Sequence, residues 1–259
     1  LHQYTMHSLA LATFCAAFLC VSKAEAAPVL SVEDLPLGNF KEFLLEARRG
    51  RNGDPSRIKR NVGMVPSCTA GMSCLNSFLS SVGLPNPLPA NPQTLMNAIT
   101  AYFLANGPQG FLTFCRAYGQ MQSCYNGQFG ACLTNVVNLV NVGKVSPNAA
   151  VAYSAIFASE QWTCSAGLSV FSNNLQCVGN VIKASNSSLL QCQANLSQQV
   201  QANPDKACNY FQSYLACYTP PFHIGCGVSV GYSVCEAARV GFLASTPGCG
   251  NLRCPTVTQ

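Results

Sequence analysis

Four cysteines in the C-terminal third of the chain follow one another at a strict interval of nine residues. They are Cys208, Cys217, Cys226 and Cys235. On an α-helix each residue turns by about 100°, so nine residues amount to about two and a half turns. Cysteines at this interval point out of opposite sides of a helix, and each can form a disulfide with a different neighbour. We therefore expect short apolar helices that are cross-linked on both sides.

The N-terminal residues have the features of a secretory signal. Residues 1–5 precede Met6, the expected start of the protein. An apolar run of 13 residues, 9–21, is too short to span a bilayer, and a small-x-small cleavage site ends at Ala26. A retained membrane anchor is the alternative interpretation. We expect residues 6–26 to be removed and the rest of the chain to be secreted into the extracellular space.

Residues 27–60 form a second segment of different character. They contain no cysteine and carry most of the charge of the secreted chain. They end in Arg57-Ile58-Lys59-Arg60, the Arg-x-Lys-Arg form that furin-like convertases cut, and Arg48-Arg49 is a weaker dibasic site. A solvated, disordered basic run is the alternative. Because the composition changes abruptly after Arg60, we expect a propeptide that is cut there.

The remaining chain, residues 61–259, is sparsely charged and rich in cysteine. Its six strong bases and three acids give a net charge of +3. These nine charged residues, in about 200, are far fewer than is usual in soluble domains. No cluster of Lys and Arg is present for a nucleic acid to bind, and no apolar run here is long and uncharged enough to span a membrane. The length fits one domain or two small ones.

The even number of cysteines in residues 61–259 indicates a disulfide framework. Metal-binding thiols are the competing interpretation, disfavoured because the chain has no Cys-x-x-Cys motif and this part has a single histidine. The pairing stays open, because 14 cysteines allow on the order of 10⁵ connectivities. The predicted framework comprises Cys68, Cys74, Cys115, Cys124, Cys132, Cys164, Cys177, Cys192, Cys208, Cys217, Cys226, Cys235, Cys249 and Cys254.

Apolar spacing and start signals predict an all-α fold. Asn91-Pro92, Ser146-Pro147 and Asn203-Pro204 each combine a helix cap with a proline at the first helical position, and Pro220-Pro221 must end a helix after Tyr218. A strand is the alternative for residues 133–142, but their apolar positions lack clean alternation. Helices are expected over residues 68–83, 95–107, 108–127, 131–143, 147–162, 164–183, 203–218 and 226–243, with a loop at 245–259.

Two motifs recur at nearly one offset and predict a tandem duplication. The segment at Cys68 matches the segment at Cys164, 96 residues later. The motif Phe-Cys-x8-Cys-Tyr with its following cysteine, at residues 114–132, matches residues 207–226 at offsets of 93 to 94. We expect related halves near 68–160 and 164–254. They hold five and nine cysteines, so at least one bridge must join them if all are paired.

Residues that carry catalytic chemistry are scarce. His223 follows Pro220-Pro221-Phe222 in a loop between cysteines and has apolar neighbours, whereas acid–base or triad chemistry needs a base positioned by a partner. Asp205 lies at a helix start, where a negative charge favours the helix dipole. Glu160 and Glu236 are far apart and form no carboxylate pair. We expect no enzyme, no cofactor and no metal site.

Two sequons predict N-linked glycans, and another modification is disfavoured. Asn186-Ser-Ser and Asn195-Leu-Ser lie in the most polar part of the chain, although such sequons also arise by chance. Serine-linked chondroitin usually needs a Ser-Gly dipeptide, which occurs nowhere in the chain.

The apolar helices also permit a carrier of a lipid or another small apolar ligand. An ordinary packed core uses the same residue types. The residues that could line such a cavity are Phe78, Leu79, Leu95, Ile99, Phe103, Val136, Leu139, Val140, Ile156 and Phe157.

The two Cys-x8-Cys-Tyr motifs, at residues 115–125 and 208–218, with Cys132 and Cys226 beside them, resemble secreted, cysteine-rich nematode proteins of the chondroitin proteoglycan 4 domain type. A related group carries a nematode domain of unknown function with similar features. The resemblance covers residues 68–254 and implies an extracellular, α-helical disulfide domain of matrix or eggshell type without known catalysis. The chain departs from the family in lacking a Ser-Gly dipeptide, the usual attachment point of chondroitin, which argues against its being a proteoglycan.

We therefore expect a secreted, disulfide-rich protein that acts by binding, in the extracellular matrix or as a released interaction factor. The alternative is a secreted carrier of a small apolar ligand. The expected partners are an extracellular protein, a glycan or an apolar ligand.

Overall fold

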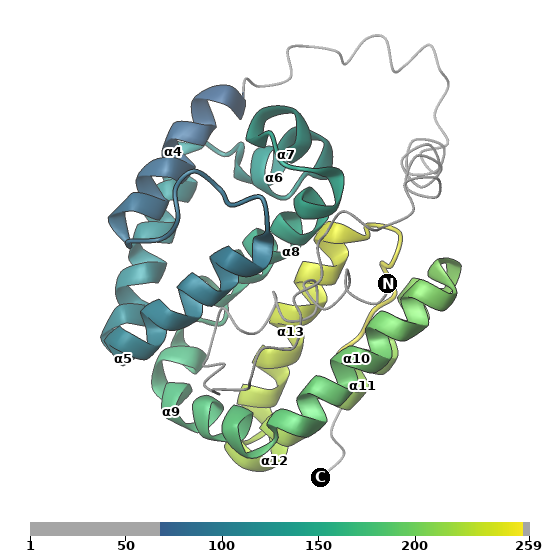
Figure 1. The fold of residues 1–259 in the computed structure, drawn as a ribbon. Coiled ribbons are helices and arrows are strands. Elements are labelled where there is room, and N and C mark those ends of the chain that lie inside the picture. The colour runs from purple at the N-terminus through teal and green to yellow at the C-terminus, as the bar shows by residue number, and fades with distance from the viewer. Residues whose placement is uncertain (1–67, 256–259) are drawn as a thin grey trace.

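The computed structural model describes residues 68–255, and the predicted all-α fold is confirmed: this part of the chain is built of helices and contains no strand (Figure 1). The predicted signal, the propeptide and the cleavage positions Ala26 and Arg60 lie outside the described residues. The helices are α4 (Cys68–Ser81), α5 (Pro92–Cys124), α6 (Phe129–Leu133), α7 (Val136–Gly143), α8 (Pro147–Thr163), α9 (Leu168–Ala184), α10 (Asn186–Ala202), α11 (Ala207–Tyr218), α12 (Pro220–Cys226) and α13 (Val228–Ser245), with a short 3₁₀ turn, η2 (Pro204–Lys206).

Caps and prolines begin the helices largely where the sequence predicted. The Asn91 side chain accepts a hydrogen bond from the Gln93 backbone N–H at 2.9 Å at the start of α5. Helix α5 is kinked at Gly107, whose φ of 55° only glycine adopts readily, so two helical arms meet before Pro108. The predicted break after Tyr218 is also confirmed, since α11 ends there.

Some local predictions differ from the structure. The helix expected at 131–143 is divided into α6 and α7, because Asn135 takes an extended backbone and caps α7 by accepting from the Asn138 backbone N–H. Asn203 makes no side-chain cap: Pro204–Lys206 forms a 3₁₀ turn before α11 begins. The alternative of a strand at 133–142 is excluded, since these residues lie in and between helices.

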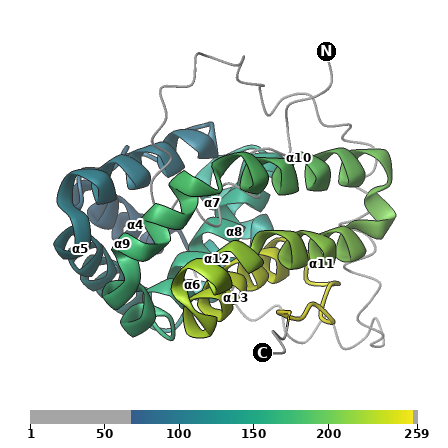
Figure 2. The same ribbon diagram turned by 90° about the horizontal axis from the view of Figure 1, so that it is seen from below.

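Helices α8 and α13 form the centre of the fold and pack along each other (Figure 1). Helix α8 is buried on nearly all sides, although it carries no cysteine. The face of α13 toward the core is rich in small residues, among them Ala237, Ala238 and Gly241. Small side chains let two helices approach closely and pack without voids. On one side of this pair, α10 and α11 form an antiparallel pair (Figure 2).

The structure does not show two tandem halves. Cys68 bonds to Cys132, but its counterpart in sequence, Cys164, bonds to Cys115 and not to Cys226. The central helices α8 and α13 come from different predicted halves and share one core. The Cys115–Cys164 bridge joins the two predicted segments, as the count of cysteines required. Matching motifs therefore do not lead to matching pairs, because packing decides which cysteines meet.

Candidate functional site

All 14 predicted framework cysteines are paired in seven disulfides. Cysteines nine residues apart on one helix bond to different neighbours, as predicted: Cys208 reaches the C-terminal segment and Cys217 reaches α10. On α5, Cys115 and Cys124 are also nine residues apart, and they likewise bond to different partners, Cys164 and Cys74. The pairs are Cys68–Cys132, Cys74–Cys124, Cys115–Cys164, Cys177–Cys226, Cys192–Cys217, Cys208–Cys249 and Cys235–Cys254.

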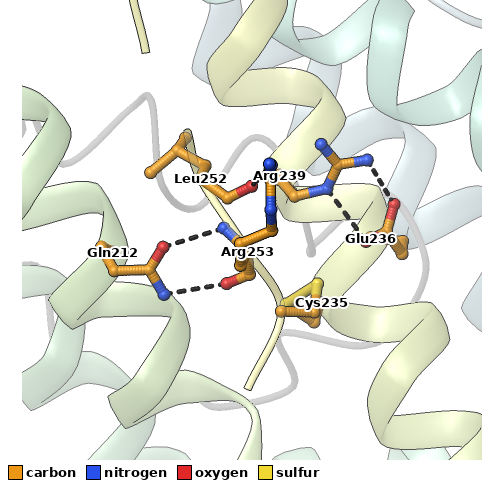
Figure 3. The surroundings of a disulfide bond; sticks show 7 residues. Gln212, Cys235, Glu236, Arg239, Leu252 and Arg253 are labelled. Carbon is orange, nitrogen blue, oxygen red and sulfur yellow. Dashed lines mark hydrogen bonds and ion pairs between the residues drawn. A yellow bond between two sulfur atoms is a disulfide. The ribbon is translucent and has the colours of Figure 1, made fainter. Parts of the chain in front are cut away.

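The C-terminal segment is held across α11 and α13 (Figure 3). The Gln212 side chain pairs with the backbone of Arg253: its Oε1 accepts from the Arg253 N–H at 2.9 Å, and its Nε2 donates to the Arg253 carbonyl at 2.8 Å. The disulfides of Cys208 and Cys235 fix the same segment at two further points. These groups are used to hold a non-helical segment in place.

The Glu236 carboxylate is occupied by an ion pair on the same helix (Figure 3). Arg239 donates from Nε to one carboxylate oxygen at 2.9 Å and from Nη2 to the other at 2.6 Å. A bidentate pair of this kind neutralises the carboxylate and fixes its orientation. The sequence predicted that Glu236 forms no carboxylate pair with Glu160. Its ion pair with Arg239 gives Glu236 a structural role.

Glu160 lies in the core on α8, which the sequence did not indicate. The residue is 2% exposed, and its Oε2 has no hydrogen-bond partner within residues 68–255. Burial raises the pKa of Glu160 to about 8, so this carboxyl is protonated at neutral pH. Nearby, the Tyr118 hydroxyl donates to the Phe157 carbonyl at 2.6 Å. A carboxyl enclosed in this way is out of reach of a substrate in solution.

The sequence predicted a loop at His223, but this residue lies in helix α12. Pro220 and Pro221 end α11 and also occupy the first turn of the new helix, where a missing backbone N–H costs nothing. The His223 ring packs against the backbone of α13. It lies so close to Gly231 that a Cβ at this glycine would come within 2.5 Å of the ring. Both ring nitrogens are buried and neither has a hydrogen-bond partner among the described residues. Burial lowers the pKa of His223 and so favours the neutral ring. Without a partner that orients it, this histidine lacks the arrangement that a general base requires.

The remaining candidates do not assemble into a reactive centre. Asp205 is exposed in the turn that precedes α11. Within residues 68–255, no group of three or more His, Cys, Asp or Glu side chains is arranged to hold a metal ion. The chemistry-bearing side chains of the described part are thus buried singly, paired for structure, or exposed alone.

Both predicted glycosylation sites lie on α10. Asn195 is exposed in the middle of the helix, where its side-chain oxygen accepts from Gln191 at 2.8 Å. Asn186 is half-buried at the first residue of the helix. The two asparagines are nine residues apart, so they point toward opposite sides of the helix. Asn195 presents the more accessible amide.

The residues considered for a cavity lining belong to one hydrophobic core. Phe78 and Phe103 each contact Phe114 edge-on, with ring centroids 5.3 and 5.1 Å apart. Ile156 and Phe157 are buried in the same cluster, and Val136 and Val140 are only partly buried against it. Such contacts are those of a close-packed interior.

An exposed apolar corner, which the sequence did not indicate, lies where α12 meets α13. Ile224, Val228 and Tyr232 are large apolar residues that are 87%, 47% and 52% exposed. Their spacing of four residues was visible in the sequence, but the burial of their neighbours was not. The sequence signal that could have identified them is Gly227 within an uncharged stretch. In the structure this glycine has a φ of 90° and separates the end of α12 from the start of α13.

No match is found for this chain among protein-family models, curated proteins or solved structures. Among residues 68–255, none of the helices combines the length and the apolar character that crossing a membrane requires.

Proposed function

We propose that this chain is a secreted, non-enzymatic protein that acts by binding or as a structural component outside the cell. The observation that carries the proposal is the pairing of all 14 cysteines of residues 68–254. Disulfides persist in oxidising compartments, and reduced cytosolic proteins rarely keep them. A fully cross-linked helical framework fits a protein that must remain folded for long periods in the extracellular space.

We propose a non-enzymatic role because the acidic and histidine side chains of the described residues are buried or engaged in structural contacts. Glu160 is enclosed in the core, Glu236 is paired with Arg239, and His223 lies against Gly231. Each of these groups lacks a second reactive group beside it or a route to a substrate. The proposed protein therefore presents surfaces rather than a reactive centre.

The finer elements of the proposal come from the sequence. We propose cleavage after Ala26 and after Arg60, and glycans on the polar helix α10. We also propose kinship with the chondroitin proteoglycan 4 domain type, in the role of a matrix component or a released interaction factor. Because Ser-Gly does not occur in the chain, the proposed protein carries no chondroitin chain at such a site.

A carrier of a lipid or a small apolar ligand is the second candidate, and the packing of the core argues against it. The apolar residues that such a ligand would contact are in contact with one another instead, as in the rings of Phe78, Phe103 and Phe114. A ligand in this region would have to displace them.

Mass spectrometry of the full chain, secreted by eukaryotic cells, tests the proposal. We expect an N-terminus at Asn61, and 14 alkylated thiols after reduction but none before it. Native mass spectra should show the protein without a bound small molecule. Free thiols before reduction would contradict the framework, and a different N-terminus would contradict the propeptide. A lipid bound at one-to-one stoichiometry would overturn the binding role in favour of the carrier.

A further inference from the structure

The exposed apolar corner, defined by Ile224, Val228 and Tyr232, is a rigid feature of the fold. Val228 and Tyr232 lie one turn apart on α13 and share a face, and Ile224 lies on α12 just before the turn at Gly227. Figure 1 shows α12 at one end of α13, at the edge of the fold. The corner therefore projects from the protein.

Packing and a disulfide hold the corner in shape. His223 sits against Gly231 and packs α12 onto α13. Cys226, at the end of α12, is bonded to Cys177 of α9. Since the backbone is fixed, exposure of these apolar side chains is a property of the folded state and not of a loose loop.

The corner lies within a long uncharged stretch of the described residues. No Asp, Glu, Lys or Arg occurs between Lys206 and Glu236. Transfer of the corner out of water would therefore desolvate no ionised side chain of this stretch, and the desolvation of such groups is the main cost of burying surface in an apolar phase.

The exposed charge of the rest of the described surface is strongly biased. Glu160 is buried and Glu236 is neutralised by Arg239, which leaves Asp205 as the one exposed acid of residues 68–255. Against it stand five exposed bases. These are Arg116, Lys144, Lys183, Lys206 and Arg253. The exposed charge of the described part is thus cationic overall and complementary to an anionic partner.

The size of the corner argues against a second copy of the chain as its occupant. An aromatic side chain offers about 150–250 Å², so three partly exposed side chains offer at most a few hundred Å². A stable protein interface needs about 800 Å² from each partner. A lipid bilayer needs no complementary surface, because a few apolar side chains can enter its interfacial region while a tyrosine hydroxyl stays among the headgroups.

We propose that the corner of Ile224, Val228 and Tyr232 inserts shallowly into lipid bilayers that carry anionic headgroups, and that the exposed bases attract the protein to them. This inference rests on the proposed extracellular binding role and assigns to it a lipid surface as partner. Binding is peripheral: the apolar side chains reach the interfacial region and the helices stay outside the bilayer.

Co-sedimentation with vesicles tests the proposal, and the chain offers a matched control. Val228 and Val137 are the same residue type and are 47% and 46% exposed, but Val137 lies on α7. We expect the secreted protein to bind phosphatidylcholine vesicles containing 30% phosphatidylserine more strongly than vesicles of phosphatidylcholine alone. Val228→Asp should weaken the partition by about tenfold or more, and Val137→Asp should leave it within about twofold.

A second variant and a measurement of mass keep the test decisive. Ile224→Asp, at the most exposed position, should weaken binding as Val228→Asp does, with seven disulfides and helical circular dichroism retained. Equal binding of both vesicle types, equal loss in both valine variants, or no binding at all would overturn the proposal. So would a dimer in sedimentation velocity that Val228→Asp dissociates, because a second copy would then cover the corner. If vesicle binding fails while the disulfides are complete and no lipid is bound, only this inference fails and the proposed function stands.

Discussion

The buried carboxyl of Glu160 makes the stability of the fold depend on pH in a direction opposite to that of ion-paired acids. Burial raises its pKa from 4.5 to about 8. Between these values the folded protein keeps the proton and the unfolded chain releases it, so the free energy of unfolding falls as the pH rises. Once the pH exceeds both values, the cost to the folded state is about 5 kcal/mol.

Replacing Glu160 by Gln keeps the shape of the side chain and removes the titration. The penalty on the wild type grows by about 3.5 kcal/mol from pH 5 to pH 8. We therefore expect the free energy of unfolding of Glu160→Gln, relative to wild type, to rise by about this amount between the two pH values. Urea denaturation with the disulfides intact, followed by circular dichroism, measures the difference. Groups present in both proteins, His223 among them, cancel in the comparison.

Tyr118→Phe is the control for this prediction. It removes the neighbouring hydroxyl that donates to the Phe157 carbonyl, and burial raises the pKa of Tyr118 well above its usual value. The hydroxyl therefore stays protonated from pH 5 to pH 8, and the change in stability should be equal at both. If Glu160→Gln behaved in the same way, with no dependence on pH, the assignment of Glu160 as a buried neutral acid would be refuted.

Three further predictions follow from the packing and exposure of single positions. Gly71→Ala should destabilise the protein by about 1–3 kcal/mol in the same denaturation assay, since a Cβ would enter the Tyr125 ring; Gly119→Ala, with open space at its Cβ, should be neutral or slightly stabilising. Asn195→Gln should remove a glycan that peptide N-glycosidase releases from the secreted wild type, seen as a loss of mass, and an unchanged mass would contradict glycosylation at this exposed position. During mild reduction, the Cys192–Cys217 bridge, which has one exposed cysteine, should open before the buried bridge between α4 and α6; alkylation and peptide mapping give the order, and the reverse order would refute it.

Local features of the fold were predictable because they depend on neighbours in the chain. A proline lacks a backbone N–H, so Pro108 marks the start of a helical arm and Pro220 the end of α11 wherever the rest of the chain lies. The nine-residue interval predicted bonds on opposite sides of a helix, since helical geometry is local. The division at Asn135 was missed because a single capping asparagine competes there with a continuous apolar pattern.

The partners in each disulfide, and the surroundings of each polar side chain, depend on contacts between distant segments. Repeated motifs suggested repeated pairing, yet Cys164 bonds to Cys115, since α5 lies against the start of α9 in the folded chain. Glu160 has an ordinary sequence context, and only the helices packed around α8 remove it from water and raise its pKa.

The sequence by itself determined the helical class, the number of cysteines that must pair and the scarcity of charge. These follow from composition and from periodicities that any helix imposes. Only the tertiary structure decided that Ile224 stays in water while its neighbour Phe222 is fully buried. Both are apolar residues of one short helix. Which of them faces the core depends on how α12 packs against α13 and against α9, which is distant in the sequence, and no local pattern encodes that contact.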